Sequence, residues 1–165
     1  MKKYSKQNIG NAGEYYIASR LSAENFIVTI TLGRAERYDI LTINPKGKTI
    51  KISVKSRFDL NIKRFPLSNK DEKGGSDDFY YAFVRLNEFK KEPDFWIVPS
   101  KVVNKILFES SNIYFNKKLR RDGKKYKDVG LRNFWLEMTK TSKELYPENW
   151  KIFLKKYYKN IRQLK

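Results

Sequence analysis

The sequence contains neither cysteine nor histidine. These two absences exclude a disulfide framework, a thiol nucleophile, an imidazole base and the usual zinc ligands. Any catalysis must therefore use carboxylate, lysine, serine, threonine or tyrosine side chains, with or without a hard metal ion bound through oxygen.

Long hydrophobic runs are also missing. No apolar segment approaches the roughly 20 residues that a membrane-spanning helix needs. The first residues, MKKYSKQNIGNAG, lack the apolar stretch of a secretory signal peptide. The sequence therefore predicts a cytoplasmic protein that does not associate with membranes.

Positive charge is the most prominent property that is present. The 165 residues include 36 Lys and Arg against 18 Asp and Glu, a formal net charge of +18, and residues 101–165 carry +12 of it. The length fits one domain, and the 40% of hydrophobic residues can form a core. We predict a single domain over residues 1–165 with a basic C-terminal extension from about residue 101, and nucleic acid as its partner.

Hydrophobic periodicity predicts an α/β fold. The predicted strands are residues 26–33, 37–44, 49–56, 79–86 and 94–98. The predicted helices are residues 7–24, 100–109 with Ser100 as N-cap, and 147–164, while residues 57–77 and 115–130 are predicted loops. Together they indicate a central mixed sheet of about five strands flanked by helices.

Two acids and a lysine are predicted to converge on one pocket. Asp39 shares a strand face with apolar residues two and four positions further on, where a carboxylate is costly without a cation. On the next strand, Ser53 and Lys55 share one face, and the tight hairpin brings that strand beside Asp39. Glu14 lies at the edge of the apolar stripe of the first predicted helix, close to the sheet.

Three segments carry a family resemblance: Gly10-x-x-Gly13-Glu14, Tyr38-Asp39-Ile40 and Ile52-Ser53-Val54-Lys55. At these positions the sequence resembles the PD-(D/E)XK nuclease superfamily, which has the restriction-endonuclease-like fold. The resemblance implies that Glu14 and Asp39 bind Mg²⁺ or Mn²⁺ and that Lys55 positions or deprotonates the attacking water. It implies a metal-dependent DNA endonuclease.

One position departs from the family pattern, because Ser53 stands where the family has its second acid, two residues before Lys55. A neutral hydroxyl is a weaker ligand for a hard dication than a carboxylate. We therefore expect at most weak cleavage. Ser53 is nevertheless one of the four candidate catalytic residues, with Glu14, Asp39 and Lys55. The alternative is a catalytically inactive nucleic-acid-binding protein with the same fold, and an RNA- or ribosome-associated protein is a third hypothesis.

The candidate site also has simpler interpretations. Asp39 and Lys55 could form a half-buried ion pair without a metal, and Glu14 could be a solvated residue near a helix N-terminus. Both interpretations are left open by the sequence.

A basic run over residues 117–127 is the second candidate feature. Its members are predicted to bind phosphates: Lys117, Lys118, Arg120, Arg121, Lys124, Lys125 and Lys127. The alternative is a solvated, solubilising loop. Aromatic residues are interleaved with charges at Arg132, Phe134 and Trp135 and at the C-terminal pair Tyr157 and Tyr158. They could stack on bases, although their helical spacing favours core packing. DNA is favoured over RNA as the partner, and a homodimer is compatible with the sequence.

Overall fold

A computed structural model describes residues 4–31, 37–117, 119, 122–140 and 142–165. The helices are α1 (Lys6–Ser22), α2 (Ser100–Lys117) and α3 (Trp150–Lys155). The strands are β1 (Ile27–Ile30), β2 (Ile40–Ile43), β3 (Thr49–Arg57), β4 (Arg64–Ser68), β5 (Phe79–Arg85), β6 (Asp94–Pro99) and β7 (Leu131–Trp135). Four 3-10 turns are η1 (Asn69–Glu72), η2 (Asn87–Phe89), η3 (Lys143–Leu145) and η4 (Arg162–Leu164).

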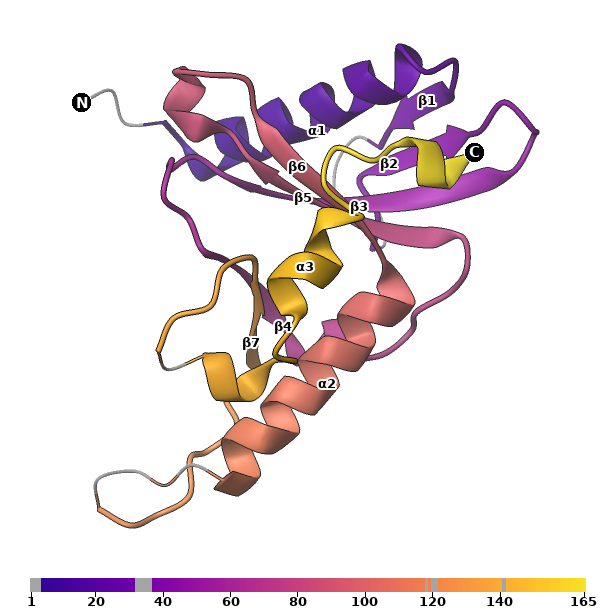
Figure 1. Cartoon of the computed structure of the whole chain (residues 1–165). Helices are drawn as coiled ribbons and strands as arrows, with labels where there is room; N and C mark the ends of the chain where they lie inside the picture. The colour runs from indigo at the N-terminus through magenta and orange to yellow at the C-terminus, as the bar shows by residue number, and fades with distance from the viewer. Residues whose placement is uncertain (1–3, 32–36, 118, 120–121, 141) are drawn as a thin grey trace.

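The central sheet has five strands in the order β1-β2-β3-β5-β6 (Figure 1). All neighbouring strands are antiparallel except β3 and β5, which are parallel. The predicted mixed sheet of five strands flanked by helices is therefore confirmed. Among the described helices, none is long and apolar enough to cross a bilayer.

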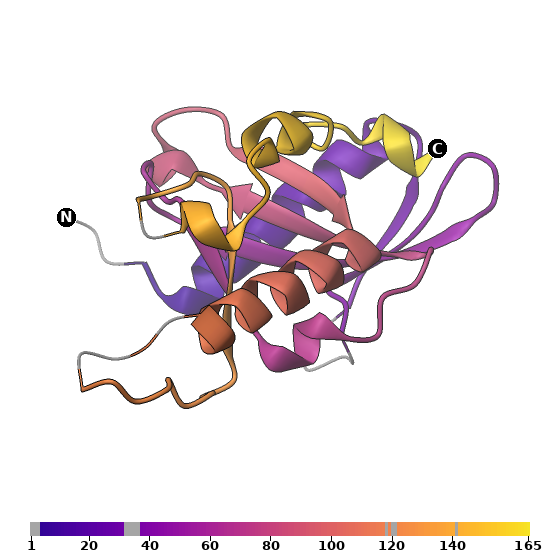
Figure 2. The same cartoon turned by 60° about the horizontal axis from the view of Figure 1, so that its bottom comes forward.

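Helices cover both faces of the sheet (Figure 2). On one face, α1 buries Ile17 and Leu21 against the strands through residues such as Ile52. On the other face, α2, α3 and the β4–β7 ribbon surround Phe83 and Phe134, whose rings stack with centroids 4.2 Å apart. The predicted core-packing role of Phe134 is confirmed, since its side chain is fully buried.

Residues 57–77 differ from the predicted loop because they contain β4. This strand pairs antiparallel with β7 in a separate two-stranded sheet, so its partner lies more than 60 positions away in sequence. Pro66 masks the strand in the sequence, because proline has no amide N–H to donate to a ladder. A two-stranded ribbon tolerates it, since each strand leaves one edge unpaired.

Helix α2 continues to Lys117 instead of ending near residue 109. Ser110 and Ser111 interrupt the apolar pattern, but their hydroxyls donate to the carbonyls of Leu107 and Phe108, 3.1 and 3.0 Å away, which satisfies them inside the helix. Ser100 was predicted to cap this helix. Its hydroxyl instead accepts from the Ser76 amide and donates to the Ser76 carbonyl, which ties the start of α2 to the segment before β5.

The predicted helix over residues 147–164 is broken after α3. Lys159 has a φ of 49°, in the left-handed region, which ends helical geometry. The segment then pairs with the edge strand β6: the Ile97 amide donates to the Tyr157 carbonyl, and the Lys159 amide donates to the Phe95 carbonyl. Pairing with the sheet edge thus replaces the last turns of the predicted helix.

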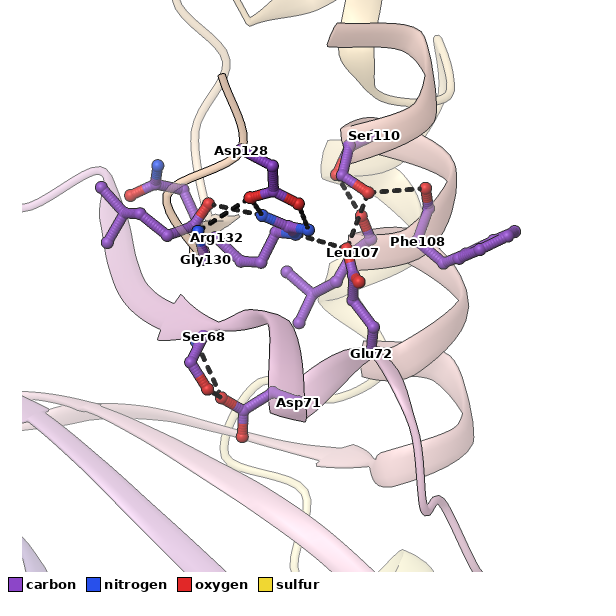
Figure 3. A network of polar contacts seen from close by, with 12 residues as sticks. Ser68, Asp71, Glu72, Leu107, Phe108, Ser110, Asp128, Gly130 and Arg132 are labelled. Carbon is purple, nitrogen blue, oxygen red and sulfur yellow. Dashed lines mark hydrogen bonds and ion pairs between the residues drawn. The ribbon is translucent and has the colours of Figure 1, made fainter. Parts of the chain in front are cut away.

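A buried arginine of β7 joins this strand to η1 and to the loop that precedes β7 (Figure 3). Arg132 is only 6% exposed. Its guanidinium donates to Glu72 and makes two bonds of 2.9 and 2.8 Å to Asp128. The Ser111 hydroxyl of α2 lies 2.7 Å from the Glu72 carboxylate and shares its single proton between Glu72 and the Phe108 carbonyl. This network therefore fixes the ribbon against α2.

The Asp128 carboxylate should make folding stability depend on pH. Hydrogen bonds from Arg132, and from the Gly130 amide, lower the pKa of Asp128 from 3.8 to about 2. Because the folded pKa is the lower one, the stabilisation is present above pH 4 and is lost as the pH falls toward 2. Asp128 is 44% exposed, so screening limits the effect to about 1 kcal/mol.

Urea unfolding of the wild type and Asp128→Asn checks this prediction. The difference in the free energy of unfolding should be about 1 kcal/mol at pH 6 and should narrow by about half at pH 3. An equal difference at both pH values would contradict it.

Candidate active site

Asp39 lies directly before β2, opposite Ser53 in the register that pairs Ile40 with Ile52. Its amide donates to the Ile52 carbonyl at 2.9 Å. Its carboxylate oxygen Oδ2 accepts from the Val54 amide at 2.6 Å and from the Ser53 hydroxyl at 3.3 Å. The other oxygen, Oδ1, accepts no hydrogen bond from the residues that the structure describes. The carboxylate is therefore held by β3 through one oxygen.

Asp39 does not share a buried apolar face of its strand, so the expectation that its carboxylate lies where burial is costly is wrong. The fully buried residues of β2 are Ile40 and Thr42, whereas Leu41 is half-buried and Ile43 is 37% exposed. Asp39 therefore belongs to the more open face. No cation is needed there to offset burial among apolar residues.

Lys55 follows Ser53 by two residues on β3, so it projects from the same side of the strand as Ser53 and Asp39. It is half-buried. Neither Asp39 nor Lys55 has an ion-pair partner within 4.0 Å in the described ranges. The simple alternative of a direct Asp39–Lys55 ion pair is therefore wrong.

Glu14 reaches this cluster from α1. It is half-buried, and burial raises its pKa above the ordinary 4.5. The Asp39 carboxylate raises the pKa further, and the Lys55 ammonium partly offsets the two effects. Because the Glu14 side chain is half-buried, it is not merely a solvated helix residue.

Gly13 lets α1 approach β3 closely enough to bring Glu14 there. A Cβ atom on Gly13 would lie 1.7 Å from the Ser56 Oγ and 2.8 Å from its Cβ. The Ser56 hydroxyl is itself buried and has no hydrogen-bond partner among the described residues. Glycine at position 13 therefore sets the distance between helix and strand.

Gly13→Ala should destabilise the fold by about 1–3 kcal/mol, the usual cost of overpacking, because the added methyl group cannot fit against Ser56. Chemical denaturation measures this loss. Ser56→Gly removes the obstructing side chain, so the double variant should recover much of the stability. Equal losses with and without Ser56 would show that the contact does not limit the packing of α1.

The cluster offers oxygen ligands suited to a hard dication: the carboxylates of Glu14 and Asp39, with the Ser53 hydroxyl beside them. The free Oδ1 of Asp39 and the mutual repulsion of the two acids fit a cation between them. No group of three or more acidic side chains that could hold a metal occurs in the described part of the chain. Water would have to complete the coordination of an ion there.

The predicted basic run lies only partly within the described residues. Lys118, Arg120 and Arg121 lie outside them, as does the side chain of Lys117. Lys124, Lys125 and Lys127 are exposed. The predicted phosphate-binding role of the run stays a prediction.

Sequence reasoning missed a pocket beside Lys55. Its volume is about 770 Å³. The residues that line it come from the start of α1, the end of β3 and β4: Tyr4, Lys6, Ile9, Val54, Lys55, Ser56, Arg57, Phe58, Asp59, Phe65 and Pro66. The strand β4, which has no strand pattern in the sequence, forms one wall, and this is why the pocket could not be predicted.

No protein-family model matches the chain, and no curated protein matches its sequence. Among solved structures, it is similar to a bacterial homing endonuclease, I-Ssp6803I, with a TM-score of 0.51 and 16% sequence identity. The similarity covers 93% of this chain and 95% of that one. The chain therefore has a nuclease-like fold over almost its full length.

Proposed function

We propose that the protein is a metal-dependent nucleic-acid phosphodiesterase that acts on DNA. The observation that carries this proposal is the orientation of Asp39: β3 binds one carboxylate oxygen through the Val54 amide and the Ser53 hydroxyl, two residues from Lys55 on the same side of that strand. The nuclease-like fold and the resemblance to PD-(D/E)XK nucleases support the same assignment.

Glu14 and Asp39 would hold Mg²⁺ or Mn²⁺. Such an ion supplies a Lewis acid that stabilises charge on the phosphate and lowers the pKa of a bound water. The Val54 amide and the Ser53 hydroxyl keep the Asp39 carboxylate in one orientation. The Lys55 ammonium can orient the attacking water or donate to a phosphate oxygen on the same side of β3.

A catalytically inactive nucleic-acid-binding protein is the second candidate. The presence of only two acids at the cluster favours it, because Ser53 adds no charge to hold a dication. The net charge of +18 suits either function.

Incubation of supercoiled plasmid DNA with the protein separates the two candidates. We expect slow nicking with Mn²⁺, slower nicking with Mg²⁺ and none with EDTA, since Mn²⁺ generally binds a given site more tightly than Mg²⁺. An RNA substrate run in parallel tests the preference for DNA. Binding without cleavage under every metal condition would reject the nuclease and retain the binding protein.

Binding of duplex DNA should weaken steeply as salt rises. Each phosphate contact adds about −0.9 to the slope of log K against log salt. Replacing Lys124, Lys125 and Lys127 by alanine should therefore make the slope shallower by up to about 2.7 if each contacts one phosphate. Fluorescence anisotropy over a salt series measures it.

The matched control removes the same charge elsewhere, by alanine at the exposed residues Lys46, Lys48 and Lys151. Its slope should stay close to the wild-type value. Identical slopes for the two triple variants would show that residues 124–127 are only a solubilising surface.

A further inference from the structure

The pocket beside Lys55 has the size and the chemistry of a nucleotide site. Its volume of about 770 Å³ lies in the range of small-molecule sites. Three cations, Lys6, Lys55 and Arg57, line it against the single acid Asp59. The rest of the wall is largely apolar or aromatic. A flat base joined to an anionic phosphate needs this combination of surfaces.

Three aromatic side chains gather at one side of the pocket, and we call them the aromatic triad: Tyr4, Phe58 and Phe89. Tyr4 and Phe58 line the pocket. The ring centroids lie 4.9 Å apart for Tyr4 and Phe58, 5.5 Å for Phe58 and Phe89, and 5.4 Å for Tyr4 and Phe89. Phe89 is nevertheless 49% exposed, so the triad presents an aromatic face to solvent.

The backbone that presents Phe89 is strained. Asn87, Glu88 and Phe89 have φ values of 54°, 56° and 56°, a left-handed conformation that non-glycine residues rarely adopt. The Glu88 amide donates to the Phe58 carbonyl at 2.7 Å, and the Asn87 side chain donates to Asp94 at 3.1 Å. The first bond holds the turn against the residue that follows β3, and the second ties it to the start of β6. Figure 1 shows this turn, between β5 and β6, at the same end of the molecule as the start of α1.

Strain of this kind persists where the surrounding structure enforces it, and it is concentrated at functional sites. Buried hydrogen bonds hold one side of the turn, because the Asn87 side chain is fully buried and donates to the Glu92 carbonyl and to Asp94, while the other side leaves Phe89 half exposed. The result is a half-exposed Phe89 ring that packs against Tyr4 and Phe58, two residues of the pocket wall.

We propose that this pocket binds the base of an unpaired nucleotide, stacked on the aromatic triad, with the adjoining phosphate at Lys55. The proposal rests on the proposed function and names its substrate class: DNA with an unpaired nucleotide beside the bond that is cut. A base within a duplex is stacked on both faces by its neighbours. An unpaired base that leaves the stack exposes a face, on which an aromatic side chain can stack.

The test compares two labelled duplexes that differ only in one extra, unpaired 2-aminopurine. Binding of the full-length protein is measured by anisotropy in EDTA, which prevents cleavage. Base–aromatic stacking is strong enough that we expect about tenfold tighter binding of the duplex with the unpaired base. A change in 2-aminopurine emission on binding should report the stacking directly.

Phe89→Asn removes the ring while supplying a residue that tolerates a positive φ, and Phe58→Leu keeps apolar volume without an aromatic face. Each should reduce the tenfold preference to less than threefold. Phe108→Ala is the matched control, since Phe108 lies on α2 and is 53% exposed. It should keep the full preference, and thermal unfolding should show that all three variants fold.

Equal affinity of the wild type for both duplexes would overturn the proposal, as would a preference that survives Phe89→Asn and Phe58→Leu. Cleavage with Mn²⁺ is measured in parallel. Cleavage without a preference for the unpaired base would reject the base pocket and would leave the proposed nuclease activity supported. Preference without cleavage would support the pocket and reject the nuclease.

Discussion

Replacing Asp39 by alanine should abolish metal-dependent cleavage, with a loss on the order of a thousandfold. The change removes the carboxylate that β3 orients, and a metal ion contributes several kcal/mol to stabilising the transition state. The rate of plasmid nicking with Mn²⁺ measures the loss. Asp77→Ala is the control, because Asp77 is 82% exposed and pairs only with Lys101 among described residues. Equal activity of wild type and Asp39→Ala would remove Asp39 from the site.

Two further variants assign the remaining roles. Lys55→Ala should slow turnover more than it weakens DNA binding, since a group acting on the reacting atoms mainly affects rate. Ser53→Glu restores the family's acid and should raise the rate with either metal. Because Ser53 is only 3% exposed, the Ser53→Asp variant, whose side chain is shorter and needs less space, should be tested alongside Ser53→Glu. Because the new carboxylate repels Asp39, Mn²⁺ should also raise the melting temperature of these variants more than that of the wild type.

Arg132→Met should lower the free energy of unfolding by about 3–5 kcal/mol. It leaves Glu72, which is 11% exposed, as a buried carboxylate without its cation. Urea unfolding measures the loss. The double variant Arg132→Met/Glu72→Leu removes both charges and should recover most of the stability. If the double variant were as unstable as Arg132→Met, the loss would come from packing around Arg132 and not from the unpaired acid.

The sequence predicts the central sheet because local patterns determine those strands. Alternating apolar residues mark β3, and a continuous apolar run marks β5. The β4–β7 ribbon has no such signal, since Pro66 breaks the pattern and the two strands lie far apart in sequence. The sequence also does not show where α3 ends. Tyr157 and Ile161 have helical spacing, but they pack in different core clusters.

For the candidate site, residue types and spacing identify which side chains meet, while the reason they meet lies in the backbone. The Val54 amide, which binds Asp39 at 2.6 Å, has no signature in the sequence. Phe89 was equally hidden, because its exposure depends on three left-handed residues and on the bond from Glu88 to Phe58.

The strand pairing after α3 has a consequence for synthesis of the protein. The edge of β6 is covered by residues 157–159, which leave the ribosome roughly sixty residues after Ile97. During that interval the nascent sheet has an open edge, which can pair with another chain. Ribosomes that stall between α2 and α3 should therefore release chains that aggregate, and chaperones that shield strand edges should act at this stage of translation.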